Sequence, residues 1–173
     1  MASTWIIDAF NVIRQSRDLV LIEAKNFEQA QQELISRLKE FAQASGEKVI
    51  CVFDHGGSAE FHRQEKYHGP VRALFTRGGE IADEVIVELA GQKKHAAIVV
   101  SSDRKVVEAS QKLGASTMNS LEFDRVLHRL HSVKNFEEEK EGFDPKKGTQ
   151  KKGPSHRRAK KDRKAYGKVK KWL

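Results

Sequence analysis

Four short apolar segments place the strongest constraint on the fold of this 173-residue chain. Each segment is nearly continuous in hydrophobic residues, without the polar–apolar alternation of a half-exposed strand, and this pattern is typical of strands buried on both faces. The stretches between them carry apolar residues at helical spacing. This βαβ alternation predicts a three-layer α/β fold, in which helices cover both faces of a mostly parallel sheet. The four predicted strands are residues 4–7, 48–53, 71–75 and 96–100.

Capping residues and glycines mark the ends of the predicted helices. Asn26 is a predicted N-cap, with Gln29 three residues later, and Gly46 ends the helix that begins there. The other predicted elements are a helix over residues 80–90, a helix from a cap at Ser102 or Asp103 to about Gly114, a short strand over 115–117 and a last helix over 120–133.

Charge is divided unevenly along the chain. Residues 143–173 hold ten lysines, three arginines and two aspartates, a charge of +11, so residues 1–142 carry −3 of the total of +8. The basic segment also lacks hydrophobic periodicity. We therefore predict a folded domain over residues 1–142 and a disordered basic tail over residues 143–173.

The basic tail is expected to bind RNA through counterion release, largely without sequence preference. Its His156, Tyr166 and Trp172 add side chains that can stack on bases. The tail could instead serve only to solubilise the chain, although a small domain does not need a charge of +11 for that purpose. The tail residues expected to contact RNA are Lys151, Lys152, Arg157, Arg158, Lys160 and Lys161.

Other sequence features favour a soluble protein of the cytoplasm. Cys51 is the single cysteine and lies within an apolar run, so we expect a buried thiol and no intramolecular disulfide. The first ten residues do not resemble a signal peptide, and no apolar run approaches the ~20 residues that span a bilayer. Structured RNA, and ribosomal RNA in particular, is the natural partner there, and no membrane partner is expected.

Acidic residues recur where the predicted strands end. Asp8, Asp54 and Asp103 each follow an apolar run, and Glu80 and Asp83 lie at the start of the predicted 80–90 helix. The carboxyl ends of parallel strands meet at one edge of a sheet, where binding sites form. Converging carboxylates repel one another unless a cation neutralises them, and oxygen ligands suit Mg²⁺ or Mn²⁺. The pattern therefore indicates a divalent-metal site suited to phosphodiester hydrolysis.

Each acidic residue also has a plain structural explanation. Glu80 and Asp83 suit the dipole of a helix N-terminus, Asp103 suits a helix cap, and Asp54 suits a turn. Asp8 is the exception, because an apolar strand end does not by itself require an acid. The coincidence of all of them at one sheet edge favours the metal site.

Four sequence blocks resemble, in order, the NYN domains of the YacP-like branch of the PIN-type nuclease superfamily. Residues 6–13 are similar to the family's DGxNxx opening, with Ala9 in place of the usual glycine after Asp8. The later blocks are residues 52–54, 79–83 and 99–104. The resemblance covers about residues 4–130 and implies a PIN-like fold with a parallel sheet in the order 3-2-1-4-5.

The same resemblance implies a divalent-metal-dependent ribonuclease. Its expected catalytic residues are Asp8, Asn11, Asp83 and Asp103. Of these, Asn11 would orient a ligand or the phosphate. The expected ligands of Mg²⁺ or Mn²⁺ are Asp8, Asp83 and Asp103, with Glu80 or Asp54 as a fourth acidic position.

Cations near the acidic residues are candidates for holding RNA. Arg63 and Lys66 lie in the polar segment after Asp54, whose His- and Gly-rich sequence departs from the family, so its contacts cannot be inherited. That segment could equally be an ordinary surface loop. Arg77 and Arg104 lie beside the acidic blocks and could grip a phosphate or pair with the acids when metal is absent.

These features support three functions. The leading hypothesis is an endoribonuclease that hydrolyses RNA phosphodiester bonds, with ribosome-associated RNA as a candidate substrate. The alternative is a non-catalytic RNA- or ribosome-binding factor with a PIN-like domain. A third is an assembly protein that binds ribosomal RNA through its tail. The presence of Asp8, Asn11, Asp83 and Asp103 together favours the enzyme.

Overall fold

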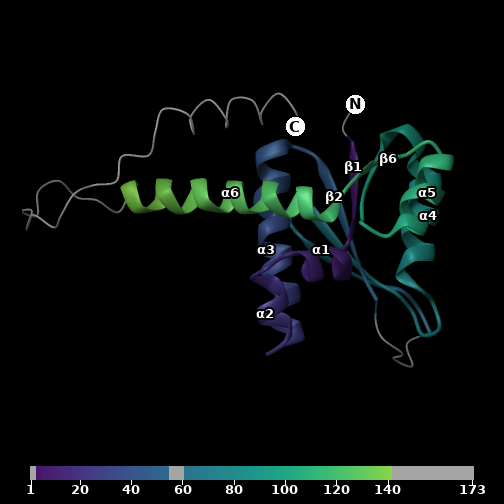
Figure 1. Cartoon of the computed structure of the whole chain (residues 1–173), viewed down its shortest axis with the longest axis horizontal. Coiled ribbons are helices and arrows are strands. Elements are labelled where there is room, and N and C mark those ends of the chain that lie inside the picture. Colours follow the sequence, from purple (N-terminus) through teal and green to yellow (C-terminus); the bar gives the residue numbers. More distant parts are fainter. Residues whose placement is uncertain (1–2, 55–60, 142–173) are drawn as a thin grey trace, which may run out of the picture. The chain divides into compact units, whose positions relative to one another are not determined.

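The computed structural model describes residues 3–54 and 61–141, with side chains up to residue 132. Its six-stranded sheet, drawn with the surrounding helices in Figure 1, has the order β3-β4-β2-β1-β5-β6. All neighbouring strands are parallel except the β3–β4 pair. The strands are β1 Thr4–Asp8, β2 Lys48–Phe53, β3 Gln64–His68, β4 Val71–Phe75, β5 Ala97–Val100 and β6 Ser116–Met118.

The parallel part of the sheet matches the expectation from sequence. Counted along the chain without β3, the five parallel strands have the order 3-2-1-4-5. All four apolar segments are strands, and the short predicted strand appears as β6, one residue later than expected. The predicted α/β class with a mostly parallel sheet is therefore confirmed.

β3 contradicts, for residues 64–68, the interpretation of the polar segment after Asp54 as a loop. Its sequence, Gln-Glu-Lys-Tyr-His, is polar and largely exposed, so it lacks the apolar signal of the other strands. It pairs only with β4, as an antiparallel hairpin at the edge of the sheet. An edge strand is solvated on one side and needs no apolar run, so the pattern that found the buried strands missed this one.

The helices follow their predicted caps. Asn26 caps α3, with its side-chain oxygen accepting a hydrogen bond from the Gln29 backbone N–H at 3.0 Å. Gly46 ends α3 in the left-handed conformation, with φ of +72°. The two shortest helices, α1 and α2, were not predicted. The helices are α1 Ala9–Gln15, α2 Leu19–Glu23, α3 Phe27–Ser45, α4 Ala82–Lys93, α5 Arg104–Lys112 and α6 Ser120–Glu141, with a 3₁₀ turn at Lys94–Ala96.

Two apolar cores, one on each face of the sheet, complete the three layers. On one face, α1, α3 and α6 pack around Trp5, whose ring lies 5.0 Å from Phe41 and 5.5 Å from Phe123 between centroids. On the other face, α4 and α5 pack over Ile6 and its neighbours. Because adjacent residues of β1 point into different cores, the strand is held from both sides, and its carboxyl end is positioned firmly.

By internal packing the chain divides into two units, residues 1–135 and 136–173. In the second unit the described residues are 136–141, which are helical. The expected tail over 143–173, with its six candidate RNA contacts, lies outside the described residues, so the 142/143 boundary stays a prediction. None of the helices in the described part of the chain has a stretch of apolar residues that would reach across a lipid bilayer.

Candidate active site

Four aspartates gather at the carboxyl ends of the parallel strands. Asp8 ends β1, Asp54 directly follows β2, Asp103 lies three residues after β5, and Asp83 is in the first turn of α4. All four line one cleft of about 470 Å³ together with Asn11. The remaining lining residues are Phe10, Arg14, Gln15, Ile81 and Ala82. Thus four acids that are up to 95 positions apart in the sequence face a single hollow.

Asp8 is the most buried of the four carboxylates, with 6% of its surface exposed. One oxygen accepts the Asn11 backbone N–H at 3.1 Å, which caps α1, and the other accepts the Ser101 hydroxyl at 2.9 Å. Burial raises the pKa of Asp8, and the negative charges of Asp83 and Asp103 add to the increase, against the lowering effect of the two hydrogen bonds. The site therefore disfavours the ionised form of Asp8.

Ser101 and Asn11 tie the ends of β1 and β5 together. The Ser101 hydroxyl donates to Asp8 and accepts the Asp103 backbone N–H at 3.1 Å. The Asn11 side-chain oxygen accepts the Ser102 backbone N–H at 2.9 Å, which leaves the amide's N–H groups as donors for a ligand. Ser101 bridges two of the candidate ligands, and the sequence analysis did not identify it. Its position directly after an apolar strand was the available signal.

Asp103 has a structural role as well as a place in the cleft. Its Oδ1 accepts the backbone N–H groups of Lys105 at 2.7 Å and Val106 at 3.3 Å, so it is the N-cap of α5. Both cap bonds use the same oxygen and do not engage Oδ2. The cap explanation and the ligand explanation are therefore compatible for this residue.

Asp83 and Asp54 complete the acidic lining. Burial raises the pKa of Asp83, the charges of Asp103 and Asp54 raise it further, and Lys105 lowers it. Asp54 accepts a long hydrogen bond of 3.4 Å from the buried Thr76 hydroxyl. The pKa of Asp83 is raised although it lies at a helix N-terminus, where the dipole favours a negative charge. Crowding of like charges and burial thus outweigh the dipole.

The spacing of the cleft carboxylates bears on which ion would fit. Among the described residues, the one set of three potential ligand atoms within 4.8 Å of one another belongs to Asp18, Asp124 and His128, which do not line the cleft. No three ligand atoms of the cleft aspartates lie this close to one another. Mg²⁺ keeps several of its waters and takes few direct carboxylates, so an all-oxygen, widely spaced set suits it or Mn²⁺ better than a tightly chelated ion.

The structure does not bring Glu80 into the cleft lining. Both of its oxygens accept hydrogen bonds from Arg63, at 2.6–3.0 Å, and its side chain also lies 3.8 Å from Arg77. The hydrogen bonds from Arg63 lower the pKa of Glu80. The fourth acidic position in the lining is occupied by Asp54, which was the other alternative from the sequence.

The four predicted RNA-binding cations of the domain also lie outside the lining. Arg63 is paired with Glu80 and Glu88, and Arg104 with Glu108 at 2.6 Å. Lys66 lies 5.3 Å from the ring centroid of Phe75. Arg77 is more than half exposed. These side chains are compatible with a peripheral role in RNA binding, but they do not form the wall of the cleft.

Arg14 is the cation that does line the cleft, and sequence reasoning missed it. Its guanidinium lies 5.3 Å from the ring centroid of Phe10, and the Phe10 ring stacks on Phe27 with centroids 5.2 Å apart. Phe10 and Arg14 are four residues apart on α1, so they share one helical face. The signal was available in the cap at Asp8, but a seven-residue helix was not expected there.

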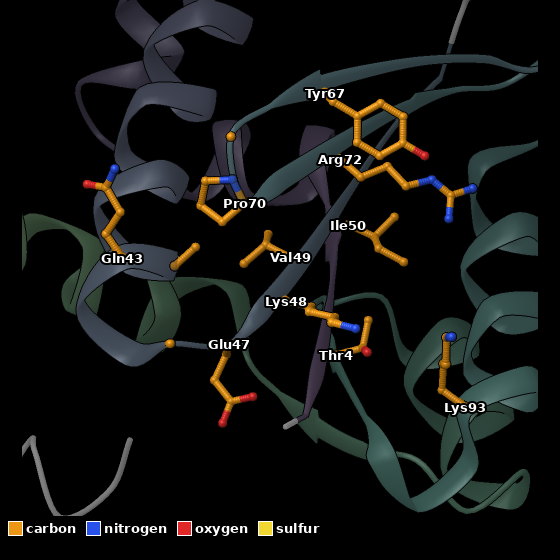
Figure 2. A pocket seen from close by; sticks show the side chains of 13 residues that line it. Thr4, Gln43, Glu47, Lys48, Val49, Ile50, Tyr67, Pro70, Arg72 and Lys93 are labelled. Carbon is orange, nitrogen blue, oxygen red and sulfur yellow. The ribbon is translucent and has the colours of Figure 1, made fainter. Parts of the chain in front are cut away.

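A second hollow, of about 670 Å³, lies at the opposite edge of the sheet (Figure 2). It is formed where β1, β2 and β4 begin and where α3 and α4 end. Lys48, Arg72 and Lys93 contribute positive charge to its lining, and Glu47 contributes a negative one. No sequence pattern indicated this hollow.

Comparison with known proteins places these observations in a family. A stretch of 85 residues is 33% identical to the uncharacterized protein YacP of Bacillus subtilis (strain 168) and covers 49% of this chain. The match also spans 49% of that relative, about half of its length.

Solved structures show the same fold. The crystal structure of Rae1 (YacP) from Bacillus subtilis superposes with a TM-score of 0.67 at 24% identity, over 96% of this chain and 86% of that one. The crystal structure of a mutant of the same Bacillus subtilis protein superposes with a TM-score of 0.65 at 26% identity, over 80% of this chain and 82% of that one.

The match that decides the family extends over residues 5–172, nearly the whole chain. The matching family is the YacP-like NYN domain, a nuclease-type domain of the PIN-like class, and it agrees with the sheet order and the acidic cleft described above. The chain therefore belongs to the YacP-like NYN domain family.

Proposed function

We propose that this protein is a divalent-metal-dependent endoribonuclease of the cytoplasm whose active site is the acidic cleft. The observation that carries the proposal is the convergence of Asp8, Asp54, Asp83 and Asp103 on one cleft, with the pKa of Asp8 and of Asp83 raised. A protein that keeps like charges crowded at a cost to itself does so most simply to bind a cation. Membership of a nuclease-type family supports the same conclusion.

The donor set suits Mg²⁺ or Mn²⁺. Asp8, Asp83 and Asp103, with Asp54 as a fourth acidic position, would hold the ion through oxygen atoms alone. Such an ion supplies Lewis-acid stabilisation of the phosphodiester and lowers the pKa of a bound water.

The chain's own side chains have distinct tasks in this scheme. Ser101 and the Asn11 backbone hold the Asp8 carboxylate in one orientation, and the Asn11 amide can donate to a phosphate oxygen. Arg14 offers the positive charge nearest the cleft and is held in place over Phe10. It would bind a phosphate next to the one that is cleaved. The basic tail would add affinity for RNA, including ribosome-associated RNA, without taking part in the chemistry.

Cleavage of an end-labelled single-stranded RNA with and without Mg²⁺ or Mn²⁺ tests this proposal. Asp83→Asn and Asp103→Asn should each lower the rate by roughly 100-fold or more, since groups that stabilise transition-state charge contribute on that scale. Asn retains the ability to cap, so Asp103→Asn should keep α5 intact.

Glu84→Gln is the matched control for Asp83→Asn. Glu84 is the next residue of α4 and is exposed, and it does not line the cleft. It should leave the rate unchanged. Wild-type protein that binds RNA but shows no metal-dependent cleavage would favour the non-catalytic RNA-binding function instead.

A further inference from the structure

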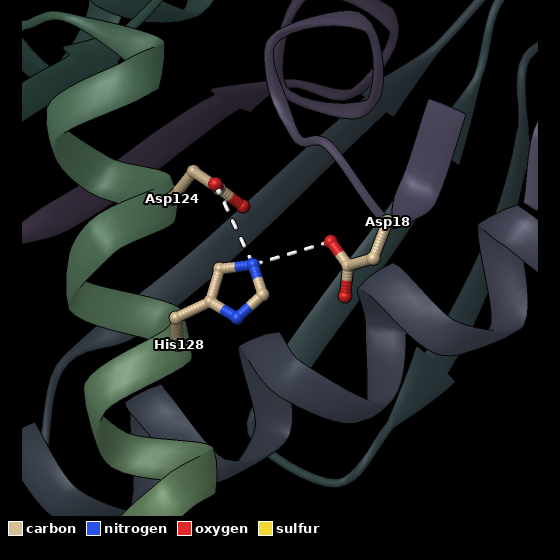
Figure 3. Close-up of side chains that lie close together, drawn as sticks. All are labelled: Asp18, Asp124 and His128. Atoms are coloured by element: carbon tan, nitrogen blue, oxygen red, sulfur yellow. Dashed lines mark hydrogen bonds and ion pairs between the residues drawn. The ribbon is translucent and has the colours of Figure 1, made fainter. Parts of the chain in front are cut away.

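A second group of potential ligands lies in the helical layer formed by α2, α3 and α6. Asp18 caps the start of α2, and Asp124 and His128 are one turn apart on α6 (Figure 3). His128 Nε2 is 3.1 Å from an Asp18 oxygen and 3.6 Å from an Asp124 oxygen. The three ligand atoms lie within 4.8 Å of one another, and none of these residues lines the cleft.

One of the two carboxylates is already compensated. Arg37 of α3 donates to Asp18 Oδ2 and, at 2.9 Å, to Glu33. Burial alone would raise the pKa of Asp18, but the hydrogen bonds from Arg37 and Ser16 dominate and hold it well below its usual range. Its Oδ1 accepts the Ser16 hydroxyl at 2.6 Å and the Leu19 backbone N–H at 3.0 Å, and it also faces His128.

The other carboxylate, Asp124, is paired through one oxygen only. The Asp124 side chain is 8% exposed, and its Oδ1 is buried without a hydrogen-bond partner among the described residues. Its Oδ2 faces the same imidazole nitrogen as Asp18. A single nitrogen carries at most one hydrogen, so His128 Nε2 cannot donate to both acids. A buried carboxylate oxygen without a partner is costly unless something supplies positive charge.

We propose that Asp18, Asp124 and His128 form a binding site for a divalent transition-metal ion of the Zn²⁺ type, separate from the nuclease cleft. Two ligands on one tetrahedral ion, with bonds of about 2.1 Å, lie about 3.4 Å apart. The observed 3.1 and 3.6 Å separations bracket this value. The proposal does not depend on the nuclease activity.

The surroundings fit such an ion. One imidazole nitrogen and two carboxylate oxygens are ligands that Zn²⁺ accepts, with water at the fourth position. Arg37 lies 3.5 Å from His128 Nε2, but its stronger bonds are to Asp18 Oδ2 and to Glu33. It can keep those bonds and orient Asp18 from behind, as the outer partners of ligating carboxylates commonly do. The ion would then link α2 to α6, which are otherwise distant in the sequence.

The test is a thermal melt of the full-length, metal-free protein during titration with Zn²⁺, together with the affinity measured by chelator competition. At a Zn²⁺ concentration 100-fold above its Kd, linkage predicts an increase in Tm of roughly 5–10 °C. His128→Gln and Asp124→Asn should each weaken Zn²⁺ binding at least tenfold and remove most of the shift. Asp124→Asn serves as the second variant in case His128→Gln folds poorly, because its amide can donate to Asp18 or to His128.

Two control variants separate this site from other ligands. Asp83→Asn removes a carboxylate from the cleft, and His131→Gln removes the neighbouring histidine of α6, which pairs with Glu40 at 3.1 Å. Both should retain the Zn²⁺ affinity and the Tm shift. The proposal is overturned if the wild type shows no shift, if His128→Gln and Asp124→Asn shift as the wild type does, or if Asp83→Asn or His131→Gln abolishes the shift.

Discussion

The two edges of the sheet have opposite charge. At the carboxyl edge the cleft is lined by four aspartates, whereas at the amino edge the hollow is lined by Lys48, Arg72 and Lys93 with Glu47. Part of this difference follows from α4 alone, which carries Asp83 in its first turn and Lys93 in its last. A helix favours acids at its start and cations at its end, and in a βαβ fold the helix starts lie at the carboxyl edge.

The helix dipole does not account for the rest. The pKa of Asp8 and of Asp83 is raised, so the carboxyl edge holds more negative charge than its surroundings stabilise. At the amino edge, Arg72 has a partner in Glu65. The comparison teaches that charge sign alone does not identify a functional site. Like charges that are crowded together, and whose pKa values are raised as a result, are a better sign of a functional site.

The largest expected effect is that of removing the charge of Asp8. Asp8→Asn should lower metal-dependent RNA cleavage by roughly 100-fold or more. Lys93→Gln, a matched change of one charge at the amino edge, should leave the rate within about twofold. The measurement is the single-turnover rate at saturating RNA. Equal losses in the two variants would mean that the edges do not differ in function.

Removal of the basic tail tests whether the tail, and not the cations at the amino ends of the strands, provides most of the affinity for RNA. A chain truncated after Gly142 carries −3. If about half of the thirteen basic side chains of the tail meet phosphates, the full-length protein should show a log–log salt slope of roughly −4 to −5 on single strands. The truncated protein should show a much flatter slope and an affinity that is lower by roughly tenfold or more. Equal affinities and slopes would contradict the assignment of the tail to RNA.

Arg14 should have a smaller effect, confined to substrate binding. Arg14→Gln removes a cation at the mouth of the cleft, and an exposed ion pair contributes about 0.5–1 kcal/mol. We expect the KM for RNA to rise roughly threefold with kcat unchanged. Arg17→Gln, an exposed arginine three residues later that does not line the cleft, is the control. A fall in kcat without a change in KM would indicate that Arg14 acts in the chemical step.

The smallest effect concerns stability and pH in the absence of metal. The folded-state pKa of Asp83 is raised above its usual 3.8, so the folded form binds the proton more tightly than the unfolded form. Stability of the wild type should therefore fall, relative to Asp83→Asn, as pH rises through the folded-state pKa. Below pH 3.8 the stability of the wild type relative to Asp83→Asn should stop changing with pH, because Asp83 is then protonated in both the folded and the unfolded form.

Melting both proteins in a chelator between about pH 3 and pH 7 checks this sign, and added Mg²⁺ should narrow the difference at neutral pH. An Asp83→Asn variant that is less stable than the wild type throughout would show that Asp83 is stabilising without metal.

The apolar runs of the sequence located both the buried strands and the acidic residues at the carboxyl ends of those strands. Apolar runs identify strands that are covered on both faces, and an acid within a few residues of the end of such a run must lie at the carboxyl ends of the strands, as Asp8 and Asp103 do. The structure brings these residues and Asp83 into one cleft. Their role as metal ligands stays a prediction.

What the sequence did not reveal depends on contacts between distant residues. Arg63 and Glu80 are 17 positions apart, and their pairing is visible only once the β3 hairpin is placed beside α4. Asp18 and His128 are 110 positions apart, and no local pattern relates them. Arg14 was missed because α1 is too short to show a periodic signal.

The strands at the two borders of the sheet also affect how the protein behaves at high concentration. An outermost strand exposes unpaired backbone groups, on which a strand of another molecule can assemble. Here β3 carries Glu65 and Lys66 on an exposed five-residue strand, and β6 has three residues. Neither offers the long apolar template that strand-by-strand aggregation needs. Replacing the two charges of β3 with valines would make this edge more apolar, so the polar residues that concealed β3 in the sequence also guard the edge against pairing with another molecule.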